Sequence, residues 1–252
     1  MATPSTSSSR LFLGTSGWAY PTWKPGFYPP GTAAKSFLAY YATRLSSVEV
    51  NYTFRTLPSP KQLEGWLTAV PSPFRFTFKA PQRITHFNRL RDCKPLLEEF
   101  LAALAPVREA KQLGLILFQL PPNFAATGEH AERLAAFLEH SSLITHRIAF
   151  EFRHASWFTE ATYSLLRSRN AALCIAESDD LATPEVHTAD TYTCFRLRHS
   201  GGYSHAELEE LSRKLTALAR DREVYAYLKH EDDPTGALDA AELLRLAGAG
   251  SA

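Results

Sequence analysis

The sequence contains few cysteines and almost no net charge. Cys93, Cys174 and Cys194 have no short spacing between them, and an odd number without a framework indicates reduced, buried thiols in a cytoplasmic protein. The formal net charge at pH 7 is +1 over 252 residues. Overall electrostatics therefore gives no reason to expect a nucleic acid or an anionic membrane as a partner, which leaves only local patches to consider.

Long apolar runs and terminal signals are also missing. No stretch approaches the roughly 18 uncharged apolar residues that a membrane-spanning helix needs, and no basic start with an apolar signal segment precedes Leu11. We therefore expect no membrane association. Residues 1–9 are small and polar and are expected to form a disordered tail, and residues 247–252 a flexible C-terminal tail. No linker-like stretch divides residues 10–246, so we expect one domain.

Short apolar runs are abundant. Eight of them, rich in Phe, Ile, Val, Leu or Tyr, predict buried strands, at Leu11–Gly14, Val48–Tyr52, Phe74–Phe78, Leu113–Gln119, Ile148–Phe152, Ala172–Ala176, Tyr192–Leu197 and Val224–Leu228. Apolar residues at three- and four-residue steps predict helices between them, at Ala33–Leu45, Ser59–Ala69, Pro95–Ala110, Glu129–His140, Thr159–Arg169, His205–Arg220 and Asp239–Leu246. Only the segment after the sixth strand, residues 178–190, lacks a helical pattern.

The alternation of strands and helices predicts parallel strands joined by right-handed crossovers. Each strand with its helix occupies about 30 residues, the size of one βα unit, and the total suits a (β/α)8 barrel. A doubly wound open sheet is the alternative, but the GTSGW segment after the first strand lacks the G-x-G-x-x-G spacing of that fold. The sequence therefore predicts an α/β protein with a single-domain, TIM-barrel-like (β/α)8 barrel.

Charged and amide side chains gather near the carboxyl ends of the predicted strands, which we call the mouth of the barrel. Such barrels place their chemistry at this face. Strand alternation puts the polar side chains on the face opposite the apolar ones, and the expected mouth residues are Glu49, Asn51, Lys79, Gln119, Glu151, Arg153, Glu177, Arg196 and Lys229. A charged side chain near apolar strands must be paired with an opposite charge or hydrated, because an isolated buried charge is costly. The group therefore predicts either a structural ion-pair network or a ligand site built on one.

Seven segments spread along the chain carry a resemblance to a known family. In order they read GTSGWAYPTW, FYP, SSVEVNYTF, FTFKAPQRITH, LGLILFQLPPNF, AFEFRHASW and YLKHEDDPTGALDAAEL. Together they resemble the DUF72 family, also called the YecE-like family, over nearly the whole chain from Leu11 onward. The resemblance implies a TIM-barrel-like fold without an established activity. One departure is visible, because many members have R-L-H-G after the seventh strand and this chain has Arg196-Leu197-Arg198-His199.

The leading hypothesis is a polar pocket for a carbohydrate or a phosphorylated small molecule, with hydrolase- or isomerase-like chemistry. Glu49 and Glu151 are the candidate catalytic acid and base. The candidate substrate-binding residues are Trp18, Asn51, Lys79, His86, Gln119, Arg153, His154, Arg196 and Lys229. Trp18 belongs to an aromatic segment that either stacks on a sugar or packs beneath a proline-rich loop.

Metal binding and covalent catalysis are weaker alternatives. Histidines and carboxylates lie near several strand ends, but no H-E-x-x-H or C-x-x-C spacing is present, so no cofactor is predicted and a divalent metal is kept only as an alternative. Lys79 or Lys229 at a strand end suits a Schiff base, which needs a lowered pKa. We expect neighbouring carboxylates to keep these lysines charged.

A rival hypothesis is a non-catalytic nucleic-acid-binding protein. Residues 79–94, KAPQRITHFNRLRDCK, hold five basic side chains and one acidic one, and such a loop fits a phosphate backbone. A solvated loop is the simpler interpretation. A metal-dependent endonuclease-like barrel is a further alternative, although it needs a cluster of metal ligands that the sequence does not assemble. We therefore expect a small-molecule ligand as the partner. The sequence does not indicate which oligomeric state the protein has.

Overall fold

The computed structural model describes residues 10–178, 181–199, 201–229 and 232–249. Eight parallel strands form one sheet in the order β1-β8-β7-β6-β5-β4-β3-β2. The strands are β1 (Leu11–Thr15), β2 (Ser47–Val50), β3 (Arg75–Lys79), β4 (Leu113–Gln119), β5 (Ile148–Glu151), β6 (Ala172–Ala176), β7 (Tyr192–Leu197) and β8 (Glu223–Leu228). This is the predicted TIM-barrel-like (β/α)8 fold, and each predicted strand is present to within two residues at either end.

The barrel is nearly closed between β1 and β2, where side chains replace most of the backbone ladder. One bridge joins Ser16 to Glu49. The Tyr41 hydroxyl accepts a hydrogen bond from the Thr15 backbone N–H at 2.8 Å and donates one to the Ser47 carbonyl at 3.0 Å. A Cβ on Gly14 would lie 1.9 Å from the Ser47 carbonyl oxygen, so only glycine lets the two strands approach this closely.

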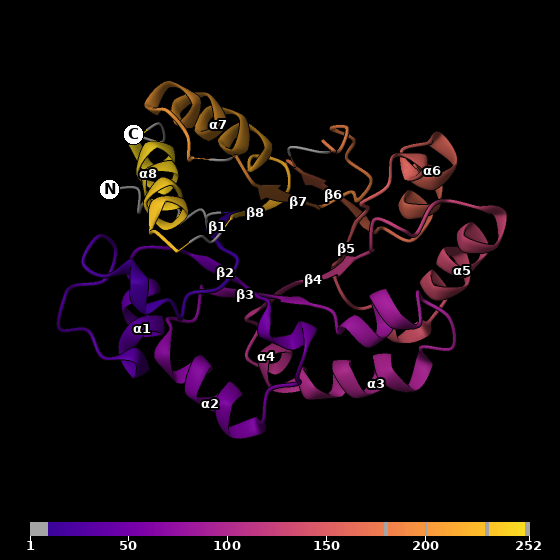
Figure 1. The fold of residues 1–252 in the computed structure, drawn as a ribbon, viewed down its shortest axis with the longest axis horizontal. Helices are drawn as coiled ribbons and strands as arrows, with labels where there is room; N and C mark the ends of the chain where they lie inside the picture. The colour runs from indigo at the N-terminus through magenta and orange to yellow at the C-terminus, as the bar shows by residue number, and fades with distance from the viewer. Residues whose placement is uncertain (1–9, 179–180, 200, 230–231, 250–252) are drawn as a thin grey trace, which may run out of the picture.

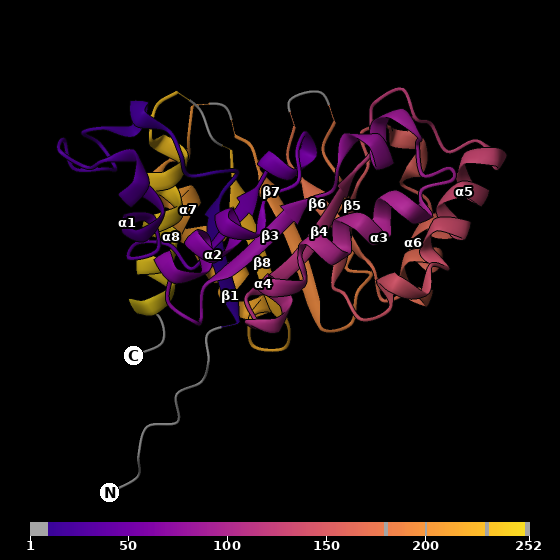
Figure 2. The same cartoon turned by 90° about the horizontal axis from the view of Figure 1, so that it is seen from below.

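Helices surround the ring of strands (Figure 1). They are α1 (Phe37–Tyr41), α2 (Pro60–Ala69), α3 (Lys94–Ala103), α4 (Ala105–Glu109), α5 (Gly128–Leu138), α6 (Glu160–Ser168), α7 (His205–Leu218) and α8 (Thr235–Ala249). Ser59 with Gln62 and Ser204 with Glu207 form capping boxes at the starts of α2 and α7, which satisfies backbone N–H groups that have no partner within the helix. Seen from the side, the strands run from their amino ends at the bottom to the mouth at the top (Figure 2).

Several helix predictions need correction. The helix predicted at 33–45 is a 3-10 turn, η2 (Ala34–Ser36), followed by the five residues of α1. The helix predicted at 95–110 divides into α3 and α4, because Pro106 has no N–H with which to continue the helical ladder. Helix α8 begins at Thr235 and continues to Ala249, past the predicted domain end at residue 246. The predicted tail at 1–9 and residues 250–252 lie outside the described residues.

Single turns connect the larger elements. The 3-10 turns are η1 (Pro21–Trp23), η3 (Tyr52–Phe54), η5 (Ser141–Leu143) and η6 (Ala155–Trp157), and η4 (Arg83–Phe87) is a π-helical turn. The described part of segment 178–190 contains no helix, as expected. No described helix is both long enough and apolar enough to span a bilayer.

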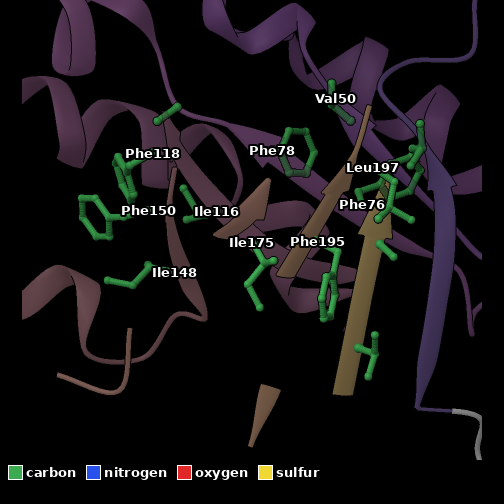
Figure 3. Packing of buried hydrophobic residues seen from close by; sticks show 14 of the residues in the cluster. Val50, Phe76, Phe78, Ile116, Phe118, Ile148, Phe150, Ile175, Phe195 and Leu197 are labelled. Atoms are coloured by element: carbon green, nitrogen blue, oxygen red, sulfur yellow. The ribbon is translucent and has the colours of Figure 1, made fainter. Parts of the chain in front are cut away.

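Two apolar layers support the mouth. Outward-facing side chains of the strands, among them Phe76, Phe78, Phe118 and Phe150, pack under the helices (Figure 3). A second layer inside the barrel contains Phe12, Leu115, Leu117, Ala149, Ala172, Cys174, Ala189, Tyr192, Cys194, Tyr225 and Tyr227. The Tyr227 hydroxyl donates to Thr77 Oγ1 at 2.6 Å. The interior is therefore filled below the strand ends, and the mouth lies above this layer.

Candidate functional site

Three fully buried charged side chains form the floor of the mouth. Glu49 on β2, Glu151 at the end of β5 and Arg196 on β7 are each at most 2% exposed. Arg196 donates to Glu49 twice, from Nε to Oε2 at 2.9 Å and from Nη2 to Oε1 at 2.8 Å. It also donates from Nη1 to Glu151 Oε2 at 2.5 Å. One guanidinium therefore connects three strands, β2, β5 and β7, that are not neighbours in the sheet.

These contacts fix the charge state of the floor. Burial is the largest influence on both carboxyls and would raise their pKa, but the charge of Arg196, together with the other cations of the mouth, outweighs it, lowers the pKa of Glu49 and brings that of Glu151 to about 2. Burial likewise opposes the charge on Arg196, and the two carboxylates outweigh it and raise the Arg196 pKa. All three side chains are therefore ionised at neutral pH.

A second group of cations surrounds the floor. Arg153, just after β5, has Nε 2.8 Å from Glu151 Oε1. Lys79 at the end of β3 donates to Gln119 Oε1 at 2.8 Å, and its Nζ lies 4.2 Å from the centre of the Phe54 ring. Burial and the neighbouring Arg196 lower the pKa of Arg198, on the same face of the chain as Arg196. We refer to Glu49, Lys79, Glu151, Arg153, Arg196 and Arg198 as the mouth cluster.

His86 joins the mouth through the π-helical turn η4. Its ring lies edge-on to Phe54 with the ring centres 4.9 Å apart, and Nδ1 is 2.9 Å from Thr85 Oγ1. Burial, followed by the charges of Lys79 and Arg153, lowers the His86 pKa. The imidazole is therefore neutral at pH 7 and offers both a donor and an acceptor.

A cavity of about 300 Å³ opens beside these groups. Its walls are formed by His86, Gln119, Leu120, Pro121, Pro122, Arg153, Ser178 and Leu181. Its size is at the lower end of the range for small-molecule sites, and it combines apolar walls with a few polar groups, as such sites do.

Buried polar atoms that lack a hydrogen-bond partner also concentrate at the mouth. Of seven such side-chain atoms among the described residues, five lie here, namely Ser16 Oγ, Asn51 Oδ1, Glu151 Oε1, Arg153 Nε and Arg198 Nε. The N–H of Arg153 Nε is close to Glu151 Oε1 but is not directed at it. Buried polar groups are normally satisfied, so the mouth is the place in the described structure where hydrogen bonding is least complete.

The structure brings most of the predicted site residues together at the mouth. Glu49, Asn51, Lys79, His86, Gln119, Glu151, Arg153 and Arg196 form its floor and rim. The network interpretation is therefore correct for the floor, where Arg196 pairs with both carboxylates. Three other groups lie here and were not predicted as site residues. Arg198 follows β7, Phe54 lies in the turn after β2, and Ser16 directly follows β1.

Three predicted binding residues lie elsewhere or make structural contacts. Trp18 is half-buried with its ring 5.3 Å from that of Trp66, edge to face. Its neighbours in the aromatic segment, Trp23, Phe27 and Tyr28, are at most 2% exposed, so the packing interpretation is correct for them and they form no stacking platform for a sugar. The His154 imidazole accepts a hydrogen bond from the Ser156 backbone N–H at the start of η6.

Lys229, the third, lines a separate cavity of only about 20 Å³, together with residues such as Tyr203, Thr235 and Asp239. This volume holds at most a single water molecule. Glu177, also expected at the mouth, accepts hydrogen bonds from the Arg198 backbone N–H at 3.0 Å and from the Tyr203 hydroxyl. These contacts tie Glu177 to the loop that follows β7.

No group of three or more His, Cys, Asp or Glu side chains within the described ranges is arranged to hold a metal ion. A second polar cavity, of about 280 Å³, lies at the opposite end of the barrel. We call it the basal cavity, and its basic side chains are Arg75, Arg108, Lys111 and Arg147. Arg147 pairs with Glu223 at 2.7 Å.

Comparison with known proteins agrees with this architecture. The profile of the family described as "Protein of unknown function DUF72" matches residues 12–252. The UPF0759 protein YunF of Bacillus subtilis is 26% identical over 186 residues, which cover 71% of this chain and 64% of YunF. The chain thus spans less than two thirds of the length of that relative.

Solved structures share the fold. A DUF72 family protein of Thermotoga maritima superposes with a TM-score of 0.83 at 27% identity, covering 94% of this chain and 99% of the other. A sugar phosphate isomerase/epimerase of Parabacteroides distasonis has a TM-score of 0.59 at 10% identity, covering 92% of this chain and 97% of the other, a likeness of fold alone. The family profile over almost the whole chain, together with the shared barrel, establishes that the chain belongs to the DUF72 family.

Proposed function

We propose that the mouth binds a small phosphorylated molecule that also carries hydroxyl groups. The observation that supports this most strongly is the charge of the mouth cluster. Its members act on one another electrostatically, and they comprise four cations and two carboxylates. The cluster therefore carries a net charge of +2 in a largely buried place.

An excess of buried positive charge is costly unless an anion offsets it. Both carboxylates are already occupied by Arg196, and Glu151 is shared with Arg153. Arg153 and Arg198 each keep a buried Nε without a hydrogen-bond partner. Because guanidinium groups bind phosphate through paired, charge-assisted hydrogen bonds, these two arginines are the proposed phosphate ligands.

The remaining polar groups suit hydroxyl groups of the same ligand. Gln119 and the neutral His86 line the cavity beside Arg153, and each can donate and accept hydrogen bonds. The cavity of about 300 Å³ has room for a short sugar or polyol phosphate. The likeness to a sugar phosphate isomerase/epimerase is one of fold, so the proposal is based on the charges and the cavity of this chain.

Glu49 and Glu151 have a different proposed role from the predicted acid and base. A general acid at neutral pH needs a raised pKa, whereas that of Glu151 is about 2 and that of Glu49 is lowered. Solvent reaches neither carboxylate. We propose that they hold Arg196 in place and keep it charged, and that the residues which contact the ligand lie above them.

Calorimetric titration of the full chain with D-ribose 5-phosphate and with D-ribose tests the proposal. We expect binding of the phosphate ester only, and a loss of affinity on the order of tenfold or more in Arg153→Gln, the size of one charge-assisted hydrogen bond. Arg108→Gln in the basal cavity is the matched control and should bind like the parent. Equal weakening by both variants, or no binding of the ester, would reject the mouth as a phosphate site.

The nucleic-acid hypothesis predicts another pattern. Phe87 is 68% exposed within residues 79–94, and Arg83 and Arg91 are exposed beside it in sequence. A salt-dependent affinity for a single-stranded oligonucleotide that falls when Arg89 and Arg91 are neutralised, without competition from ribose 5-phosphate, would favour that hypothesis.

A further inference from the structure

We propose that Lys79 is a nucleophile that forms a Schiff base with the carbonyl group of a phosphorylated aldehyde or ketone. This inference rests on the proposed function, because the arginines of the mouth would hold the phosphate while Lys79 meets the carbonyl. It narrows the substrate class from phosphate esters in general to those with a free carbonyl group.

The contacts found for Lys79 among the described residues are with neutral groups. Its Nζ donates to the neutral amide oxygen of Gln119 at 2.8 Å and lies 4.2 Å from the centre of the Phe54 ring. Within the described part of the chain, no ion pair joins Lys79 to a carboxylate, since those nearby are held by Arg196 and Arg153. The side chain is half-buried and is fixed at the end of β3.

Lys79 was expected to be charged, and its lowered pKa still leaves most of it charged at neutral pH. Carboxylates near the strand ends were expected to keep the lysine charged, and their effect on Lys79 is indeed to raise its pKa. Burial and the charge of Arg196 outweigh them and lower the Lys79 pKa to about 8. Roughly a quarter of the amine is then uncharged at pH 7.5, against about 0.1% for an ordinary lysine with a pKa near 10.4.

The proposed step is balanced without any further reactant. The Nζ lone pair attacks the carbonyl carbon, and the carbonyl π electrons move to oxygen, which takes up a proton to give a carbinolamine. Loss of that oxygen as water leaves the C=N bond to Lys79, and both protons of the water come from Nζ. His86 lies against the same Phe54 ring as Lys79 and its lowered pKa keeps it neutral, so it is the proposed carrier of these protons.

Gln119 and Phe54 are positioning residues in this proposal. The Gln119 amide oxygen holds Nζ at the edge of the cavity that Gln119 itself lines. The Phe54 ring packs against Nζ and fixes its position. Neither side chain offers a negative charge that would hold the proton on Lys79.

Reductive trapping tests the inference. The full chain is incubated with D-glyceraldehyde 3-phosphate and sodium cyanoborohydride at pH 7.5, and the labelled lysines are mapped by peptide mass spectrometry. We expect Lys79 to be labelled at least tenfold faster than exposed lysines such as Lys111, with half-maximal rate near pH 8. Lys79→Arg should lose this adduct, whereas Lys111→Arg should retain it.

Glycerol 3-phosphate separates the two proposals, because it has the phosphate but no carbonyl. It should bind, slow the labelling of Lys79 and form no adduct. If glycerol 3-phosphate binds at the mouth while labelling is spread evenly over the exposed lysines, the Schiff base is rejected and the phosphate site is retained. If glycerol 3-phosphate does not bind, the proposed function itself fails. The mapping uses the unsubstituted protein, so its result does not depend on the folding of a variant.

Discussion

Arg196 and Glu49 form a two-point ion pair across the interior of the barrel, with Nε–Oε2 and Nη2–Oε1 distances of 2.9 and 2.8 Å. The partners are 147 residues apart in sequence and almost completely buried. Removing one member of a buried pair leaves an uncompensated charge, which costs much more than the intact pair contributes.

Arg196→Met should therefore destabilise the fold strongly. The substitution removes the Arg196 charge from both Glu49 and Glu151. We expect the free energy of unfolding in urea to fall by about 3–5 kcal/mol. Arg245→Ala, which removes an exposed ion pair to Glu242, is the control and should cost less than about 1 kcal/mol. An Arg196→Met protein within 1 kcal/mol of the parent would show that the floor does not hold the barrel together.

Stability should also fall in acid because of Glu151. The folded-state pKa of about 2 lies below the ordinary value near 4.5, so the contribution of Glu151 is complete above pH 4.5 and is lost as the pH falls towards 2. This shift corresponds to about 3 kcal/mol. Urea unfolding between pH 6 and pH 3 should show a smaller pH dependence in Glu151→Gln than in the parent. Identical pH dependence in the two proteins would contradict this assignment.

The close approach of β1 and β2 gives a prediction about glycine. Gly14→Ala places a methyl group 1.9 Å from the Ser47 carbonyl oxygen, and the strands must separate to accept it. We expect a loss of several kcal/mol, or failure to fold. Gly65→Ala in α2, where a Cβ meets nothing within 4 Å, should instead stabilise by roughly 0.5–1 kcal/mol. Thermal unfolding of the two variants measures both effects. Equal changes in stability would be incompatible with a close approach of β1 and β2 that requires glycine.

The sequence was sufficient for the fold because each strand leaves a local signal. Runs such as Leu113–Gln119 are apolar on both faces, and this is typical of parallel strands covered by helices. Alternation within β7 correctly separated Arg196 from the outward-facing Phe195. Helix boundaries were less accurate, since the break at Leu104 depends on how Pro106 interrupts a ladder.

The ion pairs and pKa shifts of the site could not be predicted from such local signals. Which carboxylate pairs with Arg196 depends on barrel closure, which joins residues separated by 147 and 45 positions. The sequence therefore does not show that Arg196 holds both Glu49 and Glu151, or that the Lys79 pKa is lowered. Phe54 ends the SSVEVNYTF segment, but nothing in that segment indicates that its ring lies under Lys79.

A crystal structure of the protein grown with glycerol 3-phosphate tests the central claim most directly, because it locates the anion. The account predicts a phosphate group within hydrogen-bond distance of the Arg153 and Arg198 guanidinium groups, with its glycerol hydroxyls directed towards Gln119 and His86. A phosphate bound only in the basal cavity beside Arg108 and Lys111, with Arg153 and Arg198 making no contact to it, would contradict the account.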